Sequence, residues 1–314
     1  MRNPSDLLKI RKSILYNKYV NKDIKIASVG DTHLSSLVGM EDVNKLSEVL
    51  YESNPDYICV LGDIVDTPKE LLKDEKINEL KTLMNNSSSI APTMVILGSH
   101  DFIDEELAGF PDVMKKTPIW DEINGMPNVH LLNDEVYDDD KIFFGGYRQK
   151  WEAYYNLLNE HKEDSEAYYE EFKKHENLYK DLPEEKPRIL LTHSPESIID
   201  PKVENLLKKY NVILTGHYHD GCVPAMLDKV FPKNAGLITP RRSLFPRKAR
   251  GIVKLNSGTY LVYSGGWTKM AACVPSVLYP LDKLCNRQID ITTLTSNEEY
   301  INEEIEEKKY VLKK

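Results

Sequence analysis

Five apolar segments of this chain each run directly into a short polar stretch that contains histidine, aspartate or both. The segments are short enough to be buried β-strands. The polar stretches are Gly30–His33, Gly62–Asp66, Gly98–Asp101, Thr192–Ser194 and Thr215–Asp220. In open α/β sheets, ligands bind outside the carboxyl ends of the strands. If these strands share sheets, the five stretches converge on one rim, and the chain is an α/β protein built around a polar site.

Strand-like and helix-like patterns alternate along the chain. We expect strands over residues 13–16, 24–29, 57–61, 94–97, 189–191, 212–214 and 288–294, and a hairpin of residues 252–255 and 259–263 around Asn256-Ser257-Gly258. We expect helices over residues 41–52, 68–84 and 297–314. In the last of these, acidic residues come early and lysines late, as the helix dipole favours.

Residues 147–187 interrupt this alternation. Glycine is absent between Trp151 and Pro187, and acidic residues are frequent. We therefore expect one or two exposed helices inserted into a single domain that spans residues 1–314. The insertion is either a solvated acidic face or a cap that restricts access to a site.

Composition and charge exclude several classes of protein. The chain has 314 residues, of which 41% are hydrophobic and 29% charged, as is usual for a globular protein. Its net charge of −9 gives no general attraction for nucleic acid. Four cysteines without a C-x-x-C pair indicate neither a disulfide framework nor a cysteine zinc site. Without a membrane-spanning run or a signal-peptide pattern, we expect a cytoplasmic protein.

The five polar stretches concentrate carboxylates and imidazoles, which are costly to bury without a partner. Divalent cations supply one, and a mixed set of this kind suits manganese, iron or zinc. Seven or eight candidate ligands are too many for one ion, but they suit two ions about 3.5–4 Å apart, as in phosphatases and nucleases. Such a pair needs a bridging carboxylate, for which Asp63 is the natural candidate.

Each motif alone is weak. A lone D-x-H is usually a surface pair or a helix cap, and a lone G-D-x-x-D is usually a turn. G-H-x-H is more suggestive, because two imidazoles at i and i+2 on a loop can splay around a pair of ions. The order of the five motifs and their position after strands are what favour a site.

Together the motifs resemble the calcineurin-like metallophosphoesterase superfamily. They are Asp31-x-His33, Gly62-Asp63-x-x-Asp66, Gly98-x-His100-Asp101, His193 and Gly216-His217-x-His219. The resemblance implies a two-sheet α/β sandwich flanked by helices, with a metal site at the carboxyl ends of the strands. It implies two divalent ions; we expect manganese, with iron, zinc, cobalt and magnesium as alternatives.

Site roles also follow from the resemblance. It implies that the first ion is held by Asp31, His33 and His219, and the second by His193, His217 and residue 99, with Asp63 between them. His100 would lie at the phosphoryl or leaving-group oxygen, Asp101 would orient it, and Asp66 would fix the geometry of a ligand.

The chain departs from the family pattern at Ser99, where the family has asparagine. A serine hydroxyl is a shorter and weaker ligand than an amide carbonyl. We expect Ser99 to ligate through water or to hold the second ion loosely. This departure keeps open a weakly active enzyme or a non-catalytic metal-binding scaffold.

A basic segment over residues 229–254 follows the G-H-x-H motif. It has eight Lys and Arg residues, no acidic residue, and several apolar side chains. Arginine suits phosphate recognition, so Arg241, Arg242 and Arg247 are candidate substrate contacts. The apolar side chains could meet a lipid tail or a membrane surface. In the alternative, the arginines pair with the acidic insertion.

We therefore expect hydrolysis of a phosphodiester or pyrophosphate in a nucleotide- or lipid-linked small molecule. The stretch Ser264-Gly265-Gly266 and Cys285 resemble a bacterial membrane-associated branch that includes UDP-2,3-diacylglucosamine pyrophosphatases. A phosphomonoesterase, including a protein phosphatase, is the second reading. A nuclease is disfavoured by the net charge and by the lack of an extended basic and aromatic track.

Overall fold

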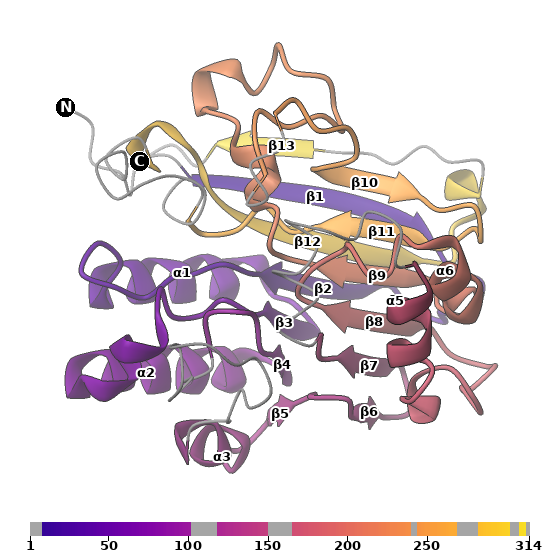
Figure 1. Ribbon diagram of the computed structural model, residues 1–314, viewed down its shortest axis with the longest axis horizontal. Coiled ribbons are helices and arrows are strands. Elements are labelled where there is room, and N and C mark those ends of the chain that lie inside the picture. Colours follow the sequence, from indigo (N-terminus) through magenta and orange to yellow (C-terminus); the bar gives the residue numbers. More distant parts are fainter. Residues whose placement is uncertain are drawn as a thin grey trace.

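Two β-sheets stacked face to face form the centre of the molecule (Figure 1). The structure is a computed structural model that describes residues 8–101, 118–149, 165–239, 244–268, 282–301 and 308–311. The first sheet has the strand order β13-β1-β12-β2-β3-β4-β5, and the second has the order β10-β11-β9-β8-β7-β6. The two stacked sheets, with helices packed beside them, confirm the predicted two-sheet α/β sandwich.

The first sheet carries three of the five polar stretches. Its strands are β1 (Leu8–Tyr16), β2 (Ile24–Val29), β3 (Tyr57–Leu61), β4 (Thr93–Ile96), β5 (Val129–Leu131), β12 (Arg287–Thr295) and β13 (Lys308–Val311). Strands β2 to β5 are parallel neighbours. Their carboxyl ends therefore lie along one edge.

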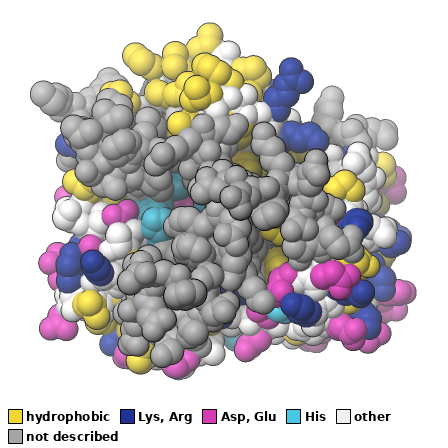
Figure 2. All heavy atoms as spheres, viewed as in Figure 1, with side chains coloured by type: hydrophobic (Ala, Val, Ile, Leu, Met, Phe, Trp, Pro, Cys, Tyr) yellow, Lys and Arg dark blue, Asp and Glu magenta, His cyan; other side chains and the backbone are white. Residues whose placement is uncertain are grey.

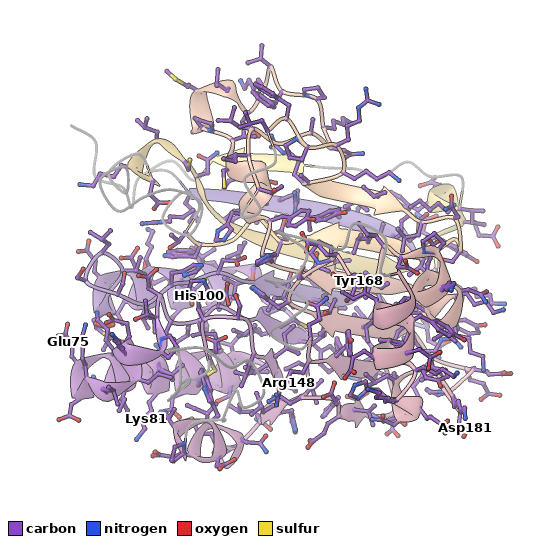
Figure 3. The ribbon with its side chains drawn as sticks, in the orientation of Figure 1. Glu75, Lys81, His100, Arg148, Tyr168 and Asp181 are labelled. Carbon is purple, nitrogen blue, oxygen red and sulfur yellow. The ribbon has the colours of Figure 1, made fainter. Side chains whose placement is uncertain are left out.

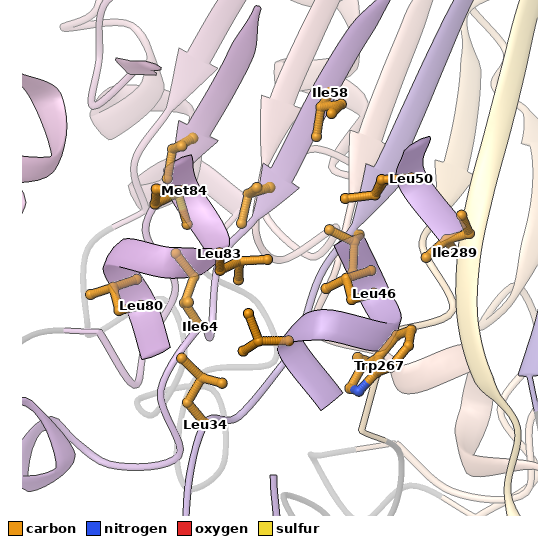
Figure 4. Packing of buried hydrophobic residues seen from close by; sticks show 14 of the residues in the cluster. Leu34, Leu46, Leu50, Ile58, Ile64, Leu80, Leu83, Met84, Trp267 and Ile289 are labelled. Atoms are coloured by element: carbon orange, nitrogen blue, oxygen red, sulfur yellow. The ribbon is translucent and has the colours of Figure 1, made fainter. Parts of the chain in front are cut away.

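Helices α1 (Met40–Ser53), α2 (Asp74–Ile90) and α3 (Pro118–Asn124) belong to the same half of the chain, and a short 3-10 turn, η2 (Pro68–Leu72), precedes α2. Helix α1 buries Val43, Leu46, Val49 and Leu50, which recur at helical spacing. These side chains pack with residues of α2 and with Ile289 of β12 (Figure 4). This packing fixes the helices on the sheet whose strand ends carry the site.

The second sheet carries the other two polar stretches. Its strands are β6 (Val136–Asp138), β7 (Phe143–Tyr147), β8 (Arg188–Thr192), β9 (Val212–Thr215), β10 (Gly251–Lys254) and β11 (Tyr260–Tyr263). Helices α5 (Ser165–Phe172) and α6 (Pro201–Leu207), with the turn η4 (Glu176–Leu178), lie on this half. Strands β8 and β9 are parallel neighbours, so their polar stretches also leave one edge together.

An apolar layer joins the two sheets. Ile26, Cys59 and Ile96 from the first sheet share one buried cluster with Ile189 and Leu214 from the second. Strands β3 and β8 contact each other across this layer. Burial on both faces explains why these strands are continuous apolar runs in the sequence.

The predicted strands and the predicted hairpin are confirmed, with ends that differ by a few residues. The strand predicted over residues 13–16 begins earlier, at Leu8, because it pairs with β12 along its full length. The helix predicted over 68–84 is divided into η2 and α2. In the predicted insertion, Phe172 and Leu178 are buried against the second sheet, while residues 150–164 lie outside the described ranges.

The prediction of a helix over residues 297–314 is wrong. Residues Glu298–Tyr300 form a single 3-10 turn, and Lys308–Val311 form strand β13, antiparallel to β1. The charge pattern that favours a helix is worth only about 0.3–1 kcal/mol per group. Pairing with the edge of β1 instead satisfies the backbone groups that an edge strand leaves open.

Candidate metal centre

The five polar stretches meet where the two sheets come together. Strands β2, β3 and β4 deliver three of them, and β8 and β9 deliver two. The sheets approach so closely here that a Cβ placed on Gly30 would lie 3.4 Å from Gly216 Cα. The His217 backbone N–H donates to both carboxylate oxygens of Asp31, each at 3.1 Å. Two residues that are 186 positions apart in the sequence thus form one side of the site.

Two buried groups of three side chains can each hold a metal ion. Each group has one carboxylate and two imidazoles whose candidate ligand atoms lie within 4.8 Å of one another. The groups are Asp31, His33 and His219, and Asp63, His193 and His217. Six of the seven residues predicted from the sequence as metal ligands are therefore brought together. The resemblance implies that Asp63 lies between the two sets, and here its carboxylate is grouped with His193 and His217.

The imidazoles are oriented by backbone carbonyl groups. His193 Nδ1 lies 2.7 Å from the carbonyl oxygen of Leu61, and His219 Nδ1 lies 2.6 Å from that of Thr268. Because a carbonyl oxygen only accepts, each Nδ1 carries a proton, which leaves Nε2 as the ring nitrogen that faces the site. Metal-binding histidines are commonly held in this way. These residues therefore fit a metal ion.

The charges within each group also fit a cation. His193 Nε2 lies 3.0 Å from Asp63 Oδ2. Burial disfavours the His193 imidazolium, but Asp63 and Asp31 outweigh it and raise the pKa of His193 to about 9. Burial, together with Asp63, raises the pKa of Asp31 to about 6. Positive charge is thus needed next to these carboxylates, and a divalent cation would supply it.

The backbone is held in an unfavourable conformation at the candidate ligands. Asp31, His33, Asp63, His217 and His219 all have positive φ angles, between 48° and 65°. Such residues cost on the order of 1–3 kcal/mol each and persist only where the surroundings determine them. The sandwich core and the hydrogen bonds around the loops supply that support.

Two glycines let the loops after β3 and β4 touch. Gly62 has a φ of +81°, and a Cβ there would lie 2.6 Å from Gly98 N. A Cβ on Gly98 would lie 2.3 Å from Asp63 Oδ1. Any side chain at either position would displace the Asp63 carboxylate or its loop.

Ser99 and His100 lie beside Asp63. The Ser99 hydroxyl is 3.4 Å from Asp63 Oδ1, and the His100 backbone N–H donates to the same oxygen at 2.9 Å. His100 Nε2 is 4.0 Å from Asp63 Oδ2, and the His100 side chain is 30% exposed. Figure 3 shows His100 at the edge of the sheets from which the polar stretches emerge. His100 therefore reaches solvent, whereas the other candidate catalytic residue, Asp101, is buried.

Asp101 does not orient His100 as predicted. Its buried carboxylate accepts hydrogen bonds from the backbone N–H groups of Ile64, Val65 and Gly98 at 2.8–3.2 Å. It therefore ties the loop after β3 to the loop after β4. The sequence could not show this, because the donors are backbone groups.

Asp66 orients the two neighbouring imidazoles. Its backbone carbonyl accepts from His100 Nδ1. Its carboxylate Oδ1 lies 3.4 Å from Nδ1 of His33, the candidate ligand whose geometry it is predicted to fix.

Two supporting residues were not predicted from the sequence. Gln149 is buried, accepts from the Ser194 backbone N–H at 2.9 Å and donates to the Ser194 carbonyl at 2.8 Å, so that it fixes the loop after His193. Thr268 orients His219 through its carbonyl. Gln149 lies two residues beyond the end of β7, and that position was the only signal in the sequence.

The structure describes only part of the basic segment over residues 229–254. Arg241 and Arg242 lie outside the described residues. Arg247 is exposed. Arg250 is buried and pairs with Asp220 and Asp228 rather than with the acidic insertion. For this arginine the predicted alternative of pairing with the insertion is wrong, because the nearer acids lie on the loop that follows His219.

The chain is similar to known metallophosphoesterases in sequence. Residues 24–221 match the family described as calcineurin-like phosphoesterase. An uncharacterized metallophosphoesterase of Helicobacter pylori strain 26695 is 25% identical over 215 residues, which cover 68% of this chain and 49% of that protein. One from Campylobacter jejuni is 25% identical over 203 residues, or 64% and 46%. The matches span about half the length of these relatives.

Solved structures give a more distant likeness. A dimetal phosphatase from Danio rerio is 11% identical with a TM-score of 0.40, covering 80% of this chain and 89% of that one. A phosphopantetheinyl hydrolase from Mycobacterium tuberculosis is 14% identical with a TM-score of 0.40, covering 79% of this chain and 91% of that one.

Within the described residues, no helix has both the length and the apolar character to cross a bilayer.

Proposed function

We propose, from the premise that this chain belongs to the calcineurin-like phosphoesterase family, that it hydrolyses a phosphodiester or a pyrophosphate with two divalent cations. Family membership makes the chain a metal-dependent phosphoester hydrolase. The observation that carries the finer proposal is the pair of buried groups, each with one carboxylate and two imidazoles, contributed by strand ends of both sheets.

Asp31, His33 and His219 would hold one cation, and His193, His217 and Asp63 the other. We assign Asp63 as the bridging carboxylate, because it interacts with members of both groups. Its charge adds to burial in raising the pKa of Asp31 in the first group, and its Oδ2 lies 3.0 Å from His193 Nε2 in the second. Ser99 would contribute only weakly, since its hydroxyl already lies within hydrogen-bond distance of Asp63. The imidazole and carboxylate donors favour manganese, with iron, zinc, cobalt and magnesium as alternatives.

When bound, a pair of divalent cations lowers the pKa of water and makes hydroxide available near neutral pH. His100 would contact the phosphoryl or leaving oxygen, because its side chain reaches solvent while its Nδ1 is held by Asp66. Burial lowers the pKa of His100, but Asp63 and the Asp66 carbonyl outweigh it and raise that pKa. A protonated Nε2 can donate to an oxygen that gains negative charge.

The proposed substrate carries a nucleotide or a lipid on its phosphate. The exposed Arg247 is a candidate contact for the phosphate group of this substrate, because guanidinium groups bind phosphate in a bidentate way. The segment resembling the UDP-2,3-diacylglucosamine pyrophosphatase branch runs beside the site, where the Trp267 backbone N–H donates to the Gly30 carbonyl. Arg241 and Arg242 remain predicted contacts.

The test begins with metal content. The purified protein is stripped with a chelator, reloaded separately with manganese, iron, zinc, cobalt or magnesium, and analysed for bound metal. Each form is then assayed on bis-p-nitrophenyl phosphate and on p-nitrophenyl phosphate. We expect about two ions per chain and a higher kcat/KM on the diester.

Other outcomes lead to other conclusions. A preference for the monoester would replace the proposal with a phosphomonoesterase. Bound metal without turnover of either ester would identify a scaffold. One ion or none per chain would contradict the two-cation centre.

A further inference from the structure

A loop region beyond the metal centre exposes large apolar side chains. We define the apolar-basic loop as the described residues 224–239 and 244–250. In it, Met226 is 80% exposed, Val230 is 76% exposed, and Leu244 and Phe245 are each 66% exposed. Figure 2 shows apolar side chains gathered at one end of the molecule, and Figure 1 shows the loops there extending beyond β1 and β10. Contiguous exposed apolar surface on a protein marks an interaction site.

Positive charge surrounds these apolar side chains. Lys229, Lys233, Arg247 and Lys248 are all exposed. The one acidic residue of the loop, Asp228, is turned inward, where Lys9 Nζ lies 3.3 Å from its Oδ2 and Arg250 pairs with its Oδ1. The outer surface of the loop is therefore cationic, although the whole chain carries a net charge of −9.

Backbone hydrogen bonds hold the segment that carries these exposed side chains. The Phe245 N–H donates to the Leu237 carbonyl at 2.9 Å, and the Gly236 N–H donates to the Pro246 carbonyl at 3.0 Å. Phe245 has a φ of 52°, in the left-handed region, which is unusual for an aromatic residue. An aromatic side chain kept exposed on a strained backbone indicates a use for that exposure.

The loop is also tied to the metal centre. Its residue Arg250 pairs with Asp220 at 3.1 Å, and Asp220 directly follows the candidate ligand His219. Lys9 Nζ lies 3.4 Å from Asp220 Oδ2, and Arg11 pairs with Asp220 Oδ1 at 3.1 Å. This buried network fixes the direction of the loop relative to the site.

We propose that the apolar-basic loop docks this protein onto the surface of an anionic lipid bilayer. Apolar side chains ringed by lysine and arginine match both the acyl boundary and the anionic headgroups of such a surface. A loop that extends outward suits a flat surface, whereas a bound helix or peptide needs a groove. This inference does not depend on which phosphoester the site hydrolyses.

The test measures binding of the full chain to lipid vesicles by co-sedimentation. The vesicles are phosphatidylcholine alone, or phosphatidylcholine with 30% phosphatidylglycerol. We expect binding only to the anionic vesicles, weakened by added salt. Leu244→Ser with Phe245→Ser should lower the partition coefficient by on the order of 100-fold, because each side chain loses its apolar burial. Lys229→Gln with Lys233→Gln should lower it by about 25-fold, or about five-fold per lysine.

The matched control is Tyr51→Ser with Leu72→Ser, which changes two side chains that are each 73% exposed on the α1 and η2 segments. This variant should bind vesicles like the unchanged protein. Turnover of bis-p-nitrophenyl phosphate in solution should be the same for all variants, so a failure of docking and a failure of the proposed activity are read separately.

Three results would overturn the docking proposal. The first is equal binding to neutral and anionic vesicles. The second is anionic binding that survives the Leu244 and Phe245 changes. The third is a dimer in analytical ultracentrifugation that these two changes dissociate, which would make the loop an interface between copies of this chain.

Discussion

Asp63 has more contacts within the candidate site than its neighbour Asp66. Its carboxylate lies beside His193 and accepts from the His100 backbone N–H. The Asp66 carboxylate lies near one candidate ligand, His33. Asp63→Asn should remove at least one bound ion and lower kcat by more than 10³-fold. Asp66→Asn should retain both ions and lose about 10–100-fold in metal affinity or activity. Metal analysis and kinetics on both variants test this, and an active Asp63→Asn protein would exclude the bridging role.

Ser99 supplies a hydroxyl where the family pattern has an amide. Its distance of 3.4 Å from Asp63 Oδ1 indicates a weak hydrogen bond. Ser99→Ala should therefore change kcat by less than tenfold. Ser99→Asn adds a carbonyl oxygen and should tighten the binding of the second ion. Manganese titration of the stripped variants measures this, and weaker binding by Ser99→Asn would show that the loop does not admit the amide.

Strand β1 illustrates what a single element contributes to the site from a distance. Its Arg11 is fully buried and pairs with Asp220, next to His219, and with Asp290 on β12. Removing one partner of a buried ion pair costs about 3–5 kcal/mol, because the remaining charges stay buried. Arg11→Met should lower the free energy of unfolding by that amount.

Lys12, the next residue of β1, is exposed and provides the control. Lys12→Met should change the free energy of unfolding by less than about 0.5 kcal/mol. Urea unfolding of the two variants compares them directly. Equal losses would mean that the length of the substituted side chain, and not the buried network, determines the effect.

The whole molecule should respond to metal as one cooperative unit, since the candidate ligands come from both sheets. A ligand at 100 times its Kd stabilises the folded state by about 2.7 kcal/mol. Manganese added to the stripped protein should therefore raise Tm by several degrees in calorimetry. Asp63→Asn should show a much smaller rise. A large rise in that variant would place the stabilising ion elsewhere.

Prediction from the sequence was most successful where periodicity and buried neighbours agree. The strands β2 and β3 have the predicted bounds, because both faces of each are buried and the apolar run ends where the site begins. The helix predicted over residues 297–314 is wrong because its local charge pattern competes with pairing at the edge of β1, which lies far away in the sequence. The role predicted for Asp101 is wrong for a similar reason, since its partners are backbone groups of another loop.

The sequence alone determined which residue types follow which strands, because each apolar run and its polar end are local. That information was enough to predict an α/β protein with a metal site at the carboxyl ends of its strands. The two-sheet sandwich and the division of the candidate ligands into two metal groups were implied by the resemblance of the motifs to a known family. Only the tertiary structure decided which atoms face each other: the carbonyl that orients each imidazole, the Asp101 bridge and the support from Gln149. It also decided that Arg250 turns inward while Phe245 stays exposed. These outcomes depend on contacts between segments that no local pattern encodes.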